Sequence, residues 1–223
     1  MKRFERLDVA TAPDGSVLTL CRHDGAYSIR VDGAELMSTR LHHSEERFAE
    51  LVCAPLGHLA RPRVLIGGLG LGFTLRAALR ALGEDAEVLV VELMDAVIRW
   101  NEDPAYGLSV EALRDHRVTV RHADVAHVLA ASPDAFDGIM LDVDNGPEAL
   151  TTARNARLYD HAGIRTAATA LRPGGRLAYW SAGSDAAFAN ALRGAGLMVE
   201  SLDARAHATA GPRHTIYLAR RAE

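Results

Sequence analysis

An apolar run at residues 64–66 is followed by a segment with four glycines, and a second apolar run further along the chain ends on an acid. The glycines are Gly67, Gly68, Gly70 and Gly72, and Glu92 stands 20 residues past the last of them. Glycine permits a positive φ in a tight turn and lets a ligand come close to the backbone. An acid at the tip of the next strand can accept hydrogen bonds from both ribose hydroxyls. This pattern predicts a nucleoside-binding parallel sheet and a cofactor that contains adenosine.

The glycine spacing also bears on which cofactor is expected. The dinucleotide fingerprint G-x-G-x-x-G requires a third glycine where this chain has Phe73 or Leu75, depending on the register. The spacing of Gly68, Gly70 and Gly72 is instead familiar from enzymes that bind S-adenosylmethionine, which carries no pyrophosphate. An ordinary strand-to-helix turn can contain the same glycines, so the position of Glu92 is what favours a cofactor site.

The composition, 223 residues of which 48% are hydrophobic, favours one globular domain with at most a small appendage. A net charge of −4 and the lack of a Lys/Arg-rich run argue against a nucleic-acid partner. No apolar run is long enough to cross a membrane, and the start of the chain lacks the apolar core of a signal peptide. Neither the cysteines nor the scattered histidines show metal-ligand spacing, so no metal is expected. We therefore expect a cytoplasmic protein that acts on a small molecule.

Residues 1–57 are expected to form a small β-rich unit with one helix. Asp-Gly pairs, which are typical of hairpin turns, separate three predicted strands at residues 17–22, 26–31 and 35–39. Ser44 is predicted to cap a helix that ends before Pro55. An exposed edge strand in this unit would let two copies pair, so a homodimer is one assembly that the sequence allows.

Residues 58–223 alternate apolar strands with helical stretches, which implies a mostly parallel sheet with helices on both faces. Five strands are predicted in this alternation, at residues 64–66, 88–92, 118–121, 138–141 and 177–180. A helix is expected from about residue 155 to residue 171, because Pro173 and the glycines after it would stop it. Two further strands, at residues 198–202 and 214–219, form a hairpin that makes the last strand antiparallel. The predicted fold is α/β, a Rossmann-like domain with a seven-stranded sheet.

Acids follow successive predicted strands, and in an open parallel sheet these strand ends form the ligand crevice. Asp124 can accept a hydrogen bond from the exocyclic amine of adenine, and Val125 can offer its backbone N–H to the ring. Asp142, with Asp144 as a second acid, can orient an acceptor amine and take its proton, because attack on a sulfonium carbon needs a neutral amine. For Asp124 and Asp142 alike, the alternative is an ordinary turn or helix-cap aspartate.

Four further residues are weaker candidates for contacts with the acceptor. His43, Ser44 and Glu45 lie where the N-terminal unit could cover the pocket, although helix capping explains Ser44 and Glu45 equally well. Trp180, at the end of a predicted strand, can line an acceptor cavity or belong to the core.

Several segments resemble the spermidine synthase family, the polyamine aminopropyltransferases built on the class I methyltransferase fold. The resemblance is carried by residues 65–75, 90–95, 122–125, 136–147 and 171–180. It implies a site for S-adenosylmethionine or its decarboxylated form that uses Glu92 and Asp124. It also implies that Asp142 stands at the position of the family's catalytic aspartate.

The chain departs from this family where polyamines are held. In that family an aspartate of the glycine loop helps hold the aminopropyl ammonium, and this chain has Gly70 at that position. The family also has Tyr-His-Glu before its Pro-Leu, where this chain has the different residues 47–49. A diamine requires several carboxylates, so the loss of such acids weakens selection for it. Methyl transfer to a small amine or related nucleophile is therefore preferred. One alternative is a polyamine aminopropyltransferase that recognises its acceptor through Asp144, Glu45 and His43, and another is a non-catalytic cofactor-binding protein.

Overall fold

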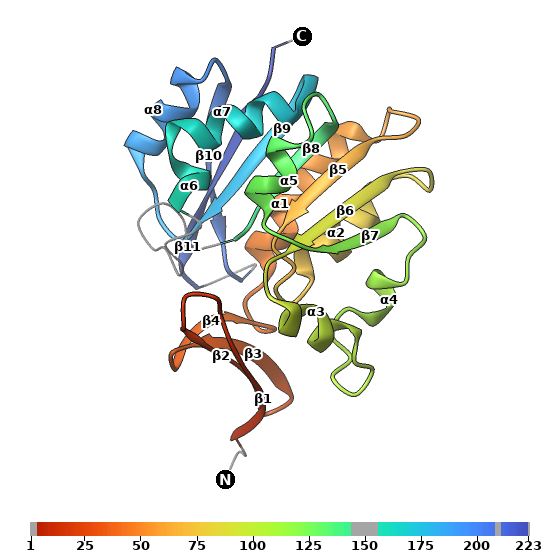
Figure 1. The fold of residues 1–223 in the computed structure, drawn as a ribbon, viewed down its shortest axis with the longest axis vertical. Coiled ribbons are helices and arrows are strands. Elements are labelled where there is room, and N and C mark those ends of the chain that lie inside the picture. The colour runs from red at the N-terminus through yellow and green to blue at the C-terminus, as the bar shows by residue number, and fades with distance from the viewer. Residues whose placement is uncertain (1–3, 144–155, 208–210, 223) are drawn as a thin grey trace.

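The computed structural model describes residues 4–143, 156–207 and 211–222. Two β-sheets organise the chain, an N-terminal sheet of four strands and a larger sheet of seven. The four-stranded sheet lies below the seven-stranded one in Figure 1 and faces the carboxyl ends of its parallel strands. The predicted α/β architecture is confirmed.

The N-terminal sheet is an antiparallel meander in the order β1-β2-β3-β4. Asp24 and Gly25 have φ values of 54° and 77°, and the corresponding turn at Asp32 and Gly33 has 47° and 85°. Positive φ at both central residues is the property of the two-residue hairpin turns that the Asp-Gly pairs predicted. The first strand was not anticipated from the sequence. The strands are β1 (Phe4–Thr11), β2 (Val17–His23), β3 (Ala26–Val31) and β4 (Ala34–Ser38).

The larger sheet has the strand order β10-β11-β9-β8-β5-β6-β7. Strands β5 to β9 pair in parallel, whereas β11 runs antiparallel to both of its neighbours. The last strand of the chain is thus antiparallel as predicted, and it lies between β9 and β10. The strands are β5 (Arg63–Gly67), β6 (Glu87–Glu92), β7 (Val118–His122), β8 (Phe136–Leu141), β9 (Leu171–Ser181), β10 (Met198–Arg205) and β11 (Arg213–Arg220).

Helices cover both faces of the larger sheet. One buried cluster joins the sheet to α1, α2 and α3, and a second joins its other face to α5, α7 and α8. The helices are α1 (His43–Cys53), the 3-10 turn η1 (Ala54–Leu56), α2 (Phe73–Ala81), α3 (Asp95–Glu102), α4 (Val110–Leu113), α5 (Val125–Ala130), α6 (Ala156–Tyr159), α7 (His161–Ala170) and α8 (Ala186–Gly194).

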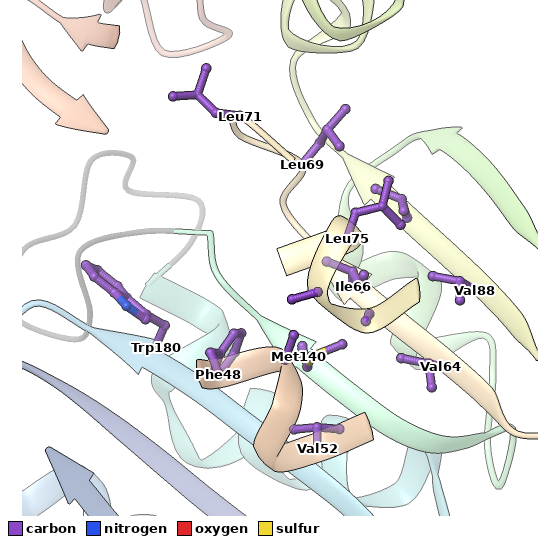
Figure 2. Packing of buried hydrophobic residues seen from close by; sticks show 14 of the residues in the cluster. Phe48, Val52, Val64, Ile66, Leu69, Leu71, Leu75, Val88, Met140 and Trp180 are labelled. Carbon is purple, nitrogen blue, oxygen red and sulfur yellow. The ribbon is translucent and has the colours of Figure 1, made fainter. Parts of the chain in front are cut away.

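Helix α1 follows the N-terminal sheet in the chain but packs into the core of the larger one. Figure 2 shows Phe48 and Val52 of α1 in one cluster with Met140 of β8 and Trp180 of β9. Phe48 and Val52 are fully buried, and burying each such side chain stabilises the fold by about 1.5–3 kcal/mol. This packing fixes the first turn of α1 next to the ends of β8 and β9.

Three local predictions were wrong. The helix expected from about residue 155 to residue 171 is interrupted, because Asp160 ends α6 and caps α7 by accepting a hydrogen bond from the Gly163 N–H at 2.8 Å. Strand β9 begins at Leu171, so the Pro-Gly-Gly stretch expected to precede the strand lies within it. Ser44 does not cap α1, which begins one residue earlier, and its hydroxyl bonds to side chains instead.

Within the part of the chain that the structure describes, no helix is long and apolar enough to cross a bilayer. The same residues contain no group of three or more His, Cys, Asp and Glu side chains that could hold a metal ion.

Candidate cofactor and acceptor site

A pocket lies between the two sheets, at the carboxyl ends of the parallel strands. The larger sheet supplies the turn after β5, the end of β6, the residues after β7 and β8, and the end of β9. Helix α1 adds Glu45 to this wall, and α2 adds Phe73 and Thr74. The N-terminal sheet and its loops form the opposite wall with Ala12, Ser16, Leu18, Ile29, Val31, Leu36 and Met37.

The glycine loop after β5 approaches neighbouring residues closely at two positions, both with a positive φ. Gly68 has a φ of +92°, and a β-carbon there would stand 2.2 Å from the carbonyl oxygen of Asp142. Gly70 has a φ of +52°, and its β-carbon would stand 2.7 Å from the sulfur of Met37. Met37 of the N-terminal sheet therefore occupies the space that a longer residue at position 70 would need.

Gly67 and Gly72 lie at the ends of this loop, outside the pocket lining. Gly67 ends β5, and Gly72 is the left-handed residue that precedes α2. Both were predicted as cofactor-binding residues, and the structure places them so that they shape the loop rather than face the pocket.

Glu92 ends β6 and is buried against the glycine loop. Its Oε2 accepts a hydrogen bond from the Leu69 N–H at 2.8 Å, and its Oε1 accepts one from the Met94 N–H at 2.8 Å. Burial raises the pKa of the Glu92 carboxyl, and the backbone donors oppose that rise. Each carboxylate oxygen can accept more than one hydrogen bond, so Glu92 could also accept hydrogen bonds from ribose hydroxyls.

Asp124 acts as a helix cap and also lines the pocket. Its Oδ1 accepts a hydrogen bond from the Ala126 N–H at 2.9 Å, and its Oδ2 pairs with the Arg157 guanidinium. Val125 is the first residue of α5, so its N–H is among those that have no carbonyl partner within the helix. The capping alternative for Asp124 is thus present, and an adenine contact by either residue stays a prediction.

Asp142 follows β8 and is half-buried at the pocket. Its N–H donates to the Gly67 carbonyl at 2.9 Å, and its Oδ2 accepts a hydrogen bond from the Thr74 hydroxyl at 3.3 Å. Burial raises the pKa of Asp142 to about 7, and the negative charge of Glu45 adds to the rise. A carboxylate with such a pKa changes its protonation state near neutral pH, which suits a general base.

Glu45 brings a second carboxylate to the same end of the pocket. The Ser44 hydroxyl donates to its Oε2 at 2.5 Å, and the Ser44 Oγ lies 2.9 Å from the Nδ1 of His214. Burial raises the pKa of Glu45 and lowers that of His214. The His214 ring packs edge-on against Trp180, with the ring centroids 4.5 Å apart. Glu45 and Trp180 thus belong to one connected group of side chains.

Two candidates remain, His43 and Asp144. His43 is exposed at the start of α1, where its N–H donates to the Ala206 carbonyl at 3.1 Å, and its side chain does not line the pocket. Asp144 lies outside the described residues. Sequence reasoning placed Ser44 near the pocket but did not predict its bond to Glu45, and it missed His214. Because Ser44 and His214 are 170 residues apart, no local pattern could have joined them.

The described lining of the pocket is acidic and contains no Lys, Arg or His side chain. Its acids are Glu45, Glu92, Asp124 and Asp142. Backbone N–H groups donate hydrogen bonds to the carboxylate of Glu92, and the Arg157 guanidinium pairs with the carboxylate of Asp124. Glu45 and Asp142 have hydroxyl donors, and the described lining offers them no cationic partner. This end of the pocket is suited to a positively charged ligand.

Comparison with known proteins gives structural neighbours only. No protein-family model matches the chain, and neither does any curated protein. A spermidine synthase in complex with the transition-state analogue AdoDATO has a TM-score of 0.74 at 14% identity, over 97% of this chain and 72% of the other. Spermidine synthase from Thermotoga maritima also has a TM-score of 0.74, at 16% identity and with the same coverage.

A methyltransferase is a more distant neighbour. The 1,6-didemethyltoxoflavin-N1-methyltransferase of Burkholderia thailandensis, bound to 1,6-didemethyltoxoflavin and S-adenosylhomocysteine, has a TM-score of 0.55 at 20% identity. That match covers 81% of this chain and 80% of the other. The chain therefore has the spermidine synthase-like, class I methyltransferase fold.

Proposed function

We propose that this chain is a transferase that moves an alkyl group from an S-adenosylmethionine-type sulfonium to a small nucleophile, an amine. The observation that carries the proposal is one pocket lined by acids on both sides of β5 and its glycine loop. Glu92 and Asp124 lie at the ends of β6 and β7, on one side of β5, and Asp142 follows β8 on the other side. Glu45 lines the same pocket. Structural neighbours bound to AdoDATO and to S-adenosylhomocysteine support the same cofactor class.

The residues present suit an adenosyl cofactor. Glu92 would accept the two ribose hydroxyls, and Asp124 and Val125 would meet the adenine. The absence of a β-carbon at Gly68 keeps the loop close to the end of β8, so the tail of the cofactor would lie near Asp142. When bound, the cofactor supplies an electrophilic carbon beside a positively charged sulfur.

Asp142 would act as the general base. The acceptor nitrogen must be neutral to attack. Burial would favour the neutral amine, and the Asp142 carboxylate would accept the proton that the ammonium loses. Because the pKa of Asp142 is about 7, a substantial fraction of the carboxylate is ionised at neutral pH. The rest of the catalysis would come from alignment of the nitrogen with the carbon and its leaving sulfur.

Methyl transfer is the preferred reaction. The family aspartate that helps hold an aminopropyl ammonium is Gly70 here, and Met37 occupies the adjacent space. Aminopropyl transfer is the second candidate, and a different observation favours it. The described lining offers no basic side chain to a methionine carboxylate, so a cofactor without that group would meet less repulsion from the pocket acids.

Titration calorimetry with S-adenosylmethionine, decarboxylated S-adenosylmethionine and S-adenosylhomocysteine tests the proposal. We expect all three to bind and the carboxylated sulfonium to bind more tightly than the decarboxylated one. The opposite preference would support aminopropyl transfer, and no binding by any of the three would refute the proposed function.

Turnover with a panel of amines tests the role of Asp142. The Asp142→Asn variant should bind the cofactor as the unmodified protein does and lose transfer activity. Asp85→Asn, a change at an exposed acid outside this pocket, is the matched control and should leave both unchanged. Cofactor binding without transfer to any amine would instead support a non-catalytic cofactor-binding protein.

A further inference from the structure

The acceptor end of the pocket combines a small amount of negative charge with a large apolar surface. Asp142 and Glu45 are the acids whose described partners are hydroxyls, from Thr74 and Ser44. Buried carboxylates without a cationic partner favour either protonation or a ligand that carries positive charge. Within the described lining, this pair therefore sets how much cationic charge the acceptor end can accommodate.

The charges of the described lining allow for one cationic acceptor. Together Asp142 and Glu45 carry at most two negative charges, and the sulfonium of a bound cofactor would compensate one of them. The ammonium and carboxylate of a methionine tail compensate each other. One further positive charge on the acceptor would complete the balance, whereas a second would be buried without a counter-ion.

The surfaces around this pair are apolar. Trp180 belongs to the same end as Glu45, because its ring contacts His214, which contacts Ser44. Facing the sheet, the N-terminal wall contributes the aliphatic side chains of Leu18, Ile29, Val31 and Leu36, together with the thioether of Met37. The described part of this wall carries no carboxylate that could hold the far end of a diamine.

We propose that the acceptor is an amine with a single positive charge on an apolar body, bound by Asp142 and Glu45 against Trp180 and the N-terminal wall. This inference rests on the proposed function, since it identifies the acceptor of the same pocket. The substrate class differs from polyamines, which would place a second ammonium against aliphatic side chains.

Ser44 and His214 act as positioning residues for Glu45. The Ser44 hydroxyl donates a hydrogen bond to Glu45, so its oxygen can accept one from His214 Nδ1, which lies 2.9 Å away. Donors arranged in this direction stabilise the ionised form of Glu45 and hold it in one orientation. Ser44 is fully buried, so the arrangement is shielded from competing water.

Calorimetry with three ligands of similar shape tests the inference: hexylamine, hexamethylenediamine and hexanol. Each is titrated into the cofactor-free protein and into protein saturated with an unreactive analogue of S-adenosylmethionine in which an ammonium replaces the sulfonium. Hexylamine should bind at least about tenfold more tightly than either of the others. Hexanol lacks the charge, and the second ammonium of the diamine would lie against the aliphatic side chains of the N-terminal wall. A diamine or an alcohol that binds as tightly as hexylamine, or no binding by any of the three, would overturn the inference.

Variants separate charge recognition from a structural effect. Glu45→Gln should weaken hexylamine binding at least about tenfold while leaving hexanol binding unchanged, and Ser44→Ala should cause a smaller loss of the same selectivity. Equal losses for amine and alcohol would show a structural role instead. Glu46→Gln is the matched control, because Glu46 pairs with Arg80 and does not line the pocket.

The two proposals can fail separately. If no adenosyl compound binds, the proposed function fails, while the ranking of the three ligands on the cofactor-free protein still reports on the acceptor end. If the cofactor binds but the diamine is preferred, the acceptor inference fails alone.

Discussion

Replacing Asp142 by asparagine should make the protein relatively more stable as the pH rises. Burial raises the folded-state pKa of Asp142 from 3.8 to about 7. Such an acid favours the folded state while it is protonated, and that contribution is lost as the pH rises through the folded pKa. Asparagine cannot ionise, so the variant is spared this loss.

The size of the effect follows from the pKa shift. At about pH 5 the unfolded chain has already lost the Asp142 proton, whereas the folded protein keeps it until the pH approaches 7. While only the folded protein holds this proton, the free energy of unfolding falls by about 1.4 kcal/mol per pH unit. The change is concentrated below the folded pKa of about 7, so it spans about two units and amounts to at most about 3 kcal/mol. The free energy of unfolding of Asp142→Asn, relative to that of the unmodified protein, should rise by about 2–3 kcal/mol over this range.

Urea unfolding of both proteins at about pH 5 and about pH 8 measures this difference. Asp85→Asn, which alters an exposed acid, should show no pH-dependent difference. Glu45→Gln should reduce the effect, because the charge of Glu45 contributes to the raised pKa of Asp142. An Asp142→Asn difference that is the same at both pH values would refute the reasoning that burial and Glu45 perturb this carboxyl.

Further substitutions probe other parts of the fold and site. Gly68→Ala should lower the free energy of unfolding by at least about 2 kcal/mol and abolish cofactor binding, because the positive φ and the carbonyl 2.2 Å away both exclude a methyl group. Gly83→Ala is the control, because a β-carbon at this position would have no atom within 4 Å. Its free energy of unfolding, measured by thermal unfolding, should change by no more than about 0.5 kcal/mol. Glu92→Gln should weaken S-adenosylhomocysteine binding about 10- to 100-fold in calorimetry, since charge-assisted hydrogen bonds to the ribose would be lost. Trp100→Phe should lower hydrogen-exchange protection in β1 by about 1–3 kcal/mol, because the 2.7 Å bond from its Nε1 to Asp8 ties that strand to α3, and unchanged protection would contradict this.

The sequence was sufficient to predict the convergence of acids at one edge of the sheet. Glu92 ends β6, Asp124 lies two residues after β7 and Asp142 directly follows β8. Parallel strands place their carboxyl ends together. The glycine run predicted the strand-to-helix turn for a similar reason, because the backbone conformation there requires glycine. Both predictions depend on residues close together in the sequence and on the regular geometry of parallel strands.

The rest of the site depends on contacts between distant segments. Glu45 reaches the pocket because Phe48 and Val52 of the same helix pack against one face of the larger sheet. Its orientation depends on Ser44, which contacts His214 of the last strand. The pairing of Asp124 with Arg157 is likewise a tertiary contact. Hydrophobic periodicity can place such residues on elements, but it carries no information on which elements meet.

A crystal structure of the complex with S-adenosylhomocysteine tests the central claim most directly. The account predicts that the ribose hydroxyls lie within hydrogen-bond distance of the Glu92 carboxylate, with the adenine beside Asp124 and the sulfur directed toward Asp142. Density for the ligand elsewhere, or at this edge with the Glu92 and Asp124 side chains turned away from it, would contradict the account.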